Sequence, residues 1–199
     1  MFLFSCNTKL KNKDLKAGFT LIELMITITI VTLVTGIVMA NYSSFNSVVL
    51  LKSQAYELAL DLRSAQVYGV SVGGTTNSFR GAYGIYFDVA NGNQNQYVLF
   101  QDQSGGVTRQ YDAGEEIGDI YTIDSRFEIF DICTPNRGAE DCSADQASVA
   151  FQRPDFDAHI WTNTVPAGDS QIDIKLRSSS NAERERVVTV YSSGQISVQ

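Results

Sequence analysis

The chain has 199 residues, of which 44% are hydrophobic and 11% aromatic, so it has room for one apolar segment and one modest globular domain. Its formal charge of −7 is unevenly divided, because residues 1–18 carry a net charge of +3 and residues 19–199 a net charge of −10. The acidic larger part contains no block of basic residues, which disfavours nucleic acid as a partner.

A long apolar run follows a short basic segment at the start of the chain. Residues 19–40 contain one formally charged side chain, that of Glu23. A helix of this length reaches about 33 Å, which is enough to cross the hydrocarbon core of a bilayer. Four lysines precede the run: Lys9, Lys11, Lys13 and Lys16. By the positive-inside rule, they predict a cytoplasmic N-terminus and an exported remainder.

Three residues at the start of the run stand in a fixed register. Gly18 comes directly before Phe19, and Glu23 follows four positions after Phe19. An ordinary secretory signal has its small residues after the apolar region, whereas here the glycine precedes it, so cleavage after Gly18 would leave the span attached. An ionisable group inside a membrane span is costly, so Glu23 is predicted to make a functional contact.

This register resembles the N-terminal signature of type IV pilins and type II secretion pseudopilins, in which a basic leader ends in glycine before Phe-Thr-Leu-Ile-Glu and a hydrophobic helix. The resemblance implies that an inner-membrane prepilin peptidase cleaves between Gly18 and Phe19 and N-methylates the new amine of Phe19. It also implies that Glu23 is an assembly contact for that amine on a neighbouring subunit. The alternative is an uncleaved single-pass anchor, in which Glu23 merely lies near the cytoplasmic interface.

The helix is predicted to continue through residues 41–72. Apolar residues recur there every three or four positions, at Leu51, Ala55, Leu58, Leu62 and Ala65. This spacing forms one stripe along a helix and predicts that this half packs against a domain. Gly73 and Gly74 are expected to end the helix.

From residue 79 the hydrophobic period changes to two, which indicates strands. Strands are expected at residues 83–89, 97–100, 106–111, 117–123, 127–132, 148–152, 158–162, 171–177, 186–191 and 195–198. Turns are expected at Asn91-Gly92 and Ser193-Gly194. Because no helical pattern separates these strands, they predict antiparallel sheets.

Two of the three cysteines lie in the part predicted to be exported. Cys133 and Cys142 bracket a predicted loop at residues 134–141, while Cys6 lies in the leader. In an oxidising compartment such a pair predicts a disulfide, and two free thiols remain the alternative where oxidative folding machinery is lacking. Without further Cys or His nearby, the pair does not indicate a zinc site.

Catalytic and metal-binding patterns are weak. His159 is the single histidine and has acidic neighbours, but no nucleophile stands at a defined spacing from it. Oxygen ligands occur at Asp88, Asn91, Asn93 and Asn95, in a spacing that does not match an EF-hand loop. We therefore expect no enzyme activity, no cofactor and no metal.

The later part of the chain is similar to the H-type minor pseudopilins and related minor pilins. The similarity lies in residues 58–66, 149–154 and 187–190, with Gly194 before the last strand. It implies an α+β, pilin-like fold in which a long N-terminal transmembrane helix packs against antiparallel β-sheets. The expected segments are a leader at 1–18, a transmembrane assembly segment at 19–40, its amphipathic continuation at 41–72 and an exported β domain at 73–199.

The resulting hypothesis is a structural minor pilin or pseudopilin of a type IV pilus or a type II secretion pseudopilus, held in the cytoplasmic membrane. Its implied partners are prepilin peptidase and other pilin or pseudopilin subunits. Two alternatives remain. One is a DNA-uptake minor pilin, with nucleic acid as a less favoured partner, and the other is an unprocessed membrane-anchored binding or adhesion domain.

Overall fold

The computed structural model describes residues 18–71, 81–90, 92–103, 109–136, 139–164, 170–179 and 181–199. The chain divides into two compact units, Met1–Ser43 and Ser44–Gln199. The first unit contributes the beginning of one long helix. The second contains the rest of that helix and all of the strands.

The helix α1 spans Leu21–Val70, close to the predicted range of 19–72. The predicted terminators Gly73 and Gly74 lie outside the described residues. Near its end the helix backbone approaches a strand closely, because a Cβ added at Gly69 would collide with the backbone carbonyl of Phe151. Glycine at this position therefore allows a contact that a side chain would prevent.

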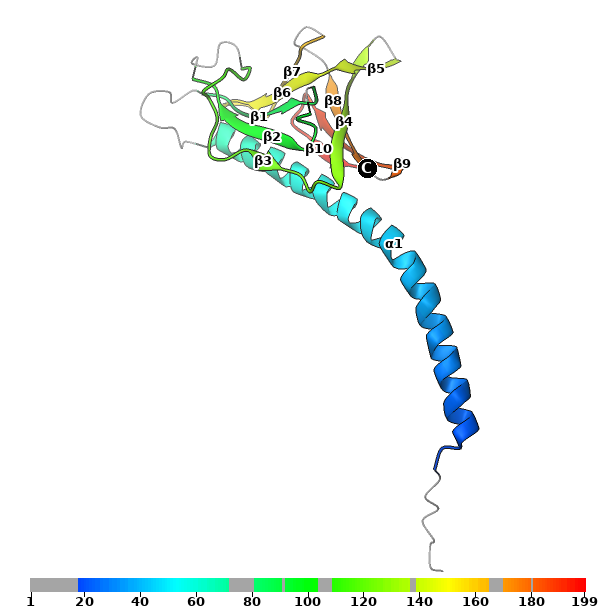
Figure 1. Ribbon diagram of the computed structural model, residues 1–199. Coiled ribbons are helices and arrows are strands. Elements are labelled where there is room, and N and C mark those ends of the chain that lie inside the picture. Colours follow the sequence, from blue (N-terminus) through cyan, green and yellow to red (C-terminus); the bar gives the residue numbers. More distant parts are fainter. Residues whose placement is uncertain are drawn as a thin grey trace, which may run out of the picture. The chain divides into compact units, whose positions relative to one another are not determined.

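Sheet A, as we call the first sheet, has five antiparallel strands in the order β3-β2-β1-β6-β7. Their bounds are β1 Tyr83–Asp88, β2 Gln96–Gln101, β3 Tyr121–Thr122, β6 Gln146–Phe151 and β7 Ala158–Thr162. The short strand β3 and the strand β7 form the two edges (Figure 1).

Sheet B, the second sheet, is also antiparallel and has the order β10-β9-β8-β4-β5. Its strands are β4 Phe127–Asn136, β5 Ala139–Ala144, β8 Gln171–Ser178, β9 Asn181–Tyr191 and β10 Ile196–Val198. Within Ser44–Gln199 the helix lies alongside both sheets (Figure 1). The predicted α+β, pilin-like fold with antiparallel sheets is confirmed.

One apolar cluster joins the second half of α1 to both sheets. All five residues of the predicted helical stripe are at most 2% exposed: Leu51, Ala55, Leu58, Leu62 and Ala65. The strands present alternate residues to the same core, as β8 does with Ile172, Ile174 and Leu176. Removing this apolar surface from water is the main favourable term in folding the unit.

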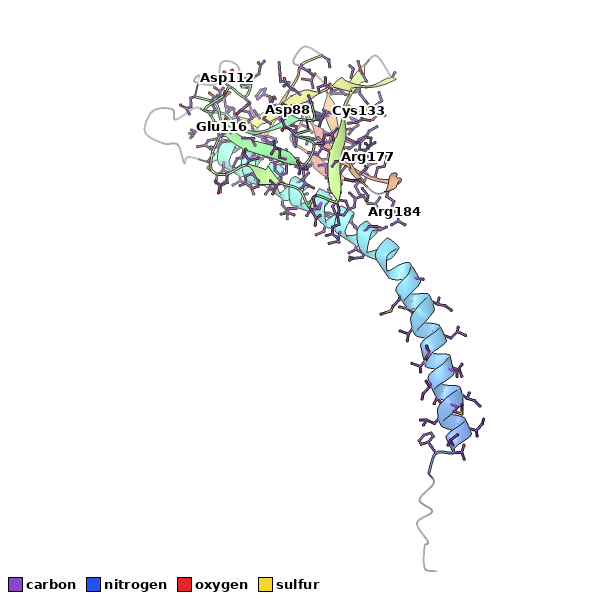
Figure 2. The ribbon with its side chains drawn as sticks, in the orientation of Figure 1. Asp88, Asp112, Glu116, Cys133, Arg177 and Arg184 are labelled. Carbon is purple, nitrogen blue, oxygen red and sulfur yellow. A yellow bond between two sulfur atoms is a disulfide. The ribbon has the colours of Figure 1, made fainter. Side chains whose placement is uncertain are left out.

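Polar contacts fix the helix on the sheets at several points along its length. The Tyr97 hydroxyl donates to Asp61 Oδ2 over 2.5 Å, and Gln66 Nε2 donates to the carbonyl of Gly194 over 3.0 Å. Arg184, labelled in Figure 2, donates to the Ser47 hydroxyl over 2.8 Å. These contacts set the position of the helix more specifically than apolar packing alone does.

Two of the sequence predictions in the middle of the chain are wrong. Of the predicted strand 117–123, the structure keeps Tyr121–Thr122 alone. Of the predicted strand 106–111, residues 109–111 form no strand and residues 106–108 lie outside the described part. Carboxylates hold a turn here instead, since Glu115 accepts hydrogen bonds from the backbone N–H groups of Gln103 and Asp112.

The segment between Cys133 and Cys142 also differs from its prediction. Of the range 134–141, the described residues 134–136 lie in β4 and 139–141 in β5, and the two strands pair as a hairpin. β5 has one buried side chain, that of Ala144, so it lacks the apolar alternation that indicates a strand. Its backbone pairing with β4 makes it a strand.

Candidate functional site

The residues around the expected cleavage point lead directly into α1. Gly18, Phe19 and Thr20 precede the first helical residue. The Thr20 hydroxyl accepts a hydrogen bond from the backbone N–H of Glu23 over 3.3 Å, and the Thr20 carbonyl accepts one from the N–H of Leu24 over 3.1 Å. Thr20 is therefore the N-cap of the helix, and Glu23 occupies the acidic position of a capping box.

The capping arrangement places a carboxylate in the first helical turn. A negative charge there is favourable, because the unpaired backbone N–H groups give a helix N-terminus partial positive charge. Sequence reasoning missed Thr20, although the Thr-x-x-Glu spacing was a usable signal.

The helical segment Leu21–Ala40 is long and apolar enough to cross a membrane, with a mean hydropathy of 2.3. None of it is buried within the structure, and its side chains project all around the helix (Figure 2). An apolar surface of this extent is unfavourable in water. It requires a bilayer or the apolar surfaces of other proteins around it.

Three threonines of this segment satisfy their hydroxyl groups within the helix. Thr27, Thr29 and Thr32 donate their hydroxyls to backbone carbonyls one turn back, over 2.9, 2.8 and 2.7 Å. In a bilayer each polar group must find its partner inside the protein. These internal hydrogen bonds meet that requirement.

Residues 14–39 match the family described as the prokaryotic N-terminal methylation motif. This match supports a type IV pilin-like protein. The matched residues include Gly18, Phe19 and Glu23, the three that the sequence singled out. Neither a curated protein nor a solved structure matches the chain.

The match concerns the N-terminal segment and supports a subunit that is processed and anchored in a membrane. It also points to a structural role and to assembly with other pilins. Phe19 is 81% exposed, and the space around Gly18 is open, since a Cβ added there would meet no atom within 4 Å. The bond between the two residues is thus accessible.

Cys133 and Cys142 lie in the second unit, on paired strands of sheet B. The structure joins Cys133, which is buried on β4, to Cys142, which is exposed on β5, by a disulfide. Lys175 on β8 lies beside this bond and forms an ion pair with Glu140 over 2.7 Å. Burial lowers the pKa of Lys175, but the neighbouring carboxylates outweigh it and raise this pKa overall.

One acidic side chain shares the space near the disulfide. The ligand atoms of Asp131, Cys133 and Cys142 lie within 4.8 Å of one another. The two sulfurs are bonded to each other, so neither is the thiolate that a zinc site uses.

Two of the other candidate ligands, Asp88 and Asn93, accept hydrogen bonds from nearby residues. Asp88 Oδ1 accepts the N–H of Ala90 over 2.9 Å, and Asn93 Oδ1 accepts from Gln96 over 2.8 Å. Asn91 lies outside the described residues. His159 is half-buried on β7, where burial and the nearby Arg109 lower the pKa of its imidazole.

Proposed function

We propose that the chain is a minor pilin or pseudopilin subunit of a type IV pilus or a type II secretion pseudopilus. Prepilin peptidase cleaves it after residue 18 and N-methylates Phe19. The subunit then remains in the cytoplasmic membrane, with its N-terminus on the cytoplasmic side and the unit from residue 44 onward exported, until it is assembled.

The observation that carries this proposal is the register of three residues at the start of an exposed apolar helix. Gly18 and Phe19 lie in open surroundings, and Glu23 follows within the first helical turn. All three fall inside the matched methylation motif. An uncleaved anchor does not require Gly18, Phe19 and Glu23 in this register. A charge such as that of Glu23 would only lower the hydrophobicity of its span.

Glu23 has a chemical role in assembly under this proposal. Cleavage creates a cationic amine at Phe19, which lies just outside the helix that Thr20 caps. In the low dielectric of a membrane an isolated charge is costly, and the amine of one subunit and the Glu23 carboxylate of the next stabilise each other. Only one axial offset between neighbours brings them together, so the pair selects that offset.

Two observations on the second unit support the finer parts of the proposal. The disulfide between Cys133 and Cys142 suits an oxidising compartment, as expected for an exported unit. The helix lying against two antiparallel sheets is the arrangement that the resemblance to H-type minor pseudopilins implied. We therefore favour that subtype.

The first test is N-terminal sequencing of protein extracted from membranes, which should find a methylated Phe19 as the first residue. Gly18→Trp should retain the leader, because a bulky side chain should not fit a peptidase cleft that accepts glycine. Gly36→Trp is the matched control, since it makes the same replacement inside the span and should leave cleavage normal. An intact leader on the wild-type protein would remove the proposal.

The second test separates anchoring from assembly. Glu23→Leu removes the charged group of the span, so the variant should insert and be cleaved after Gly18. It should nevertheless co-purify poorly with other pilin subunits. Thr32→Leu, which also replaces a polar residue of the span, should co-purify normally. Wild-type recovery of partner subunits with Glu23→Leu would show that this carboxylate is not an assembly contact.

A further inference from the structure

A hollow of about 100 Å³ lies between the second half of α1 and sheet A. It is lined by Asp61, Ser64 and Tyr68 from the helix and by Ile85, Tyr97, Leu99 and Tyr121 from the sheet. The helical residues stand three and four positions apart and thus share one face. Strands β2 and β3 run beside this part of the helix (Figure 1). The volume suits a small group or the end of a side chain.

The charge in this hollow comes from one carboxylate, that of Asp61, among the residues that line it. Its Oδ2 accepts the hydroxyl of Tyr97, which is 5% exposed. Burial and the bond to Asp61 raise the pKa of Tyr97, so this tyrosine stays a neutral donor at physiological pH. A carboxylate has about four lone-pair sites, so this one bond leaves Asp61 able to accept more.

Aromatic rings form much of the remaining wall. Tyr97 and Tyr121 are stacked, with ring centroids 5.5 Å apart and an angle of 11° between their planes. Tyr121 is 39% exposed and Tyr68 is 51% exposed, so two of the lining tyrosines reach the surface of the domain. The face of a tyrosine ring carries negative electrostatic potential and attracts cations.

We propose that this hollow binds an alkylammonium group, either the end of a lysine side chain on a partner protein or a free primary amine. The ammonium donates to Asp61 and lies against the tyrosine rings, while its alkyl stem passes between Tyr68 and Tyr121. Anions are disfavoured by the carboxylate. A bare divalent cation would find one carboxylate where calcium takes six to eight oxygen ligands. This inference does not depend on the proposed role in a filament.

The test uses the full chain in detergent micelles and two probes, n-butylammonium chloride and lysine capped at both ends as N-acetyl-lysine methylamide. Tyrosine resonances followed by NMR should shift with each probe and saturate, whereas sodium chloride at equal ionic strength should not shift them. Saturation by both probes indicates a lysine of a partner protein. Saturation by butylammonium alone indicates a free amine. In that case the two amide groups of the capped lysine prevent its side chain from entering the hollow.

Three variants decide whether binding occurs in this hollow. Asp61→Asn keeps the shape of the carboxylate without its charge, and Tyr121→Leu removes a partly exposed wall. Each should weaken binding by about fivefold or more, the size of a cation–π or charge contribution. Tyr56→Leu is the control, because Tyr56 is 49% exposed on the same helix and does not line the hollow. No saturable binding, or unchanged binding in both hollow variants, would overturn the proposal.

Discussion

The two halves of α1 are both helical, but their side chains meet different surroundings. Every residue of Leu21–Ala40 is exposed, and apolar side chains cover that segment all round. In residues 51–65 one stripe is buried, while residues such as Lys52, Tyr56 and Leu60 remain exposed. One continuous helix therefore needs two environments, an apolar one for its first half and a sheet-covered one for its second.

This difference means that substitutions in the two halves should have different consequences. The second half contributes to the core of the domain, so changes there should alter the free energy of unfolding. The first half contributes no buried side chain to that core, so changes there should alter membrane insertion or assembly instead. The predictions below test this division, from the largest expected effect to the smallest.

The largest effect should come from truncating the buried stripe. Leu58 is 1% exposed, so Leu58→Ala should lower the free energy of unfolding by about 3 kcal/mol through lost burial and a cavity. Leu60, two residues on, is 58% exposed, and Leu60→Ala should change the free energy of unfolding by less than about 0.5 kcal/mol. Urea unfolding of both variants in detergent measures the contrast. Equal effects of the two substitutions would contradict the distinction between a buried and an exposed face in the second half of α1.

The disulfide should contribute somewhat less. Cys133 and Cys142 are nine residues apart, and closing so short a loop stabilises the folded state by about 2–3 kcal/mol in the loop-entropy model. The double variant Cys133→Ser, Cys142→Ser should show this loss in urea unfolding, and adding a reductant to the wild type should reproduce it. Two alkylatable thiols in non-reduced protein from cells would contradict the bond itself.

Glycines in the two halves provide a matched comparison. Gly69→Ala should destabilise the domain by about 2 kcal/mol, because the new Cβ collides with the Phe151 carbonyl and outweighs the helix propensity of alanine. Gly36→Ala meets no atom within 4 Å and should leave domain unfolding unchanged. Thermal unfolding followed by near-ultraviolet circular dichroism distinguishes them. A stabilised Gly69→Ala protein would show that the helix can shift away from β6.

The smallest effect concerns alkaline pH. Because the folded-state pKa of Tyr97 is raised above its ordinary value of about 10, the contact stabilises the domain below that pH and loses this stabilisation as the pH rises further. Tyr97→Phe should flatten the fall in stability above about pH 10. Burial and the bond to Glu116 raise the pKa of Tyr111 to about 12, which is a smaller rise than that of Tyr97. Tyr111→Phe should therefore reduce the loss of stability at alkaline pH by less than Tyr97→Phe does. Unfolding midpoints measured from pH 8 to 12 check both.

Elements whose side chains alternate between core and solvent were predictable. The stripe of α1 and the alternating strand β8 could be identified from the spacing of their apolar residues alone. β5 was missed because Ala144 is its one buried residue, and the register with β4 that makes it a strand is invisible in its composition. Residues 109–111 have a turn conformation in which Arg109 has a φ of 54°, a local choice that periodicity does not reveal.

The same distinction explains which parts of the candidate sites were found. Gly18, Phe19 and Glu23 lie within six consecutive positions, so a linear motif identifies them. The hollow depends on Asp61 meeting Tyr97 from 36 residues away, a contact that exists only after the helix has packed on the sheet. No spacing rule connects residues brought together by tertiary structure.

The order in which the core strands occur along the chain has a consequence for biogenesis. The apolar stripe that begins at Leu51 is synthesised early, while the strands β8 and β9 that share its core follow more than 100 residues later. Until those strands have been synthesised, the stripe therefore lacks part of its native cover. We therefore expect the domain to close only after β8 and β9 have been synthesised, so that folding of the core follows synthesis of almost the whole chain.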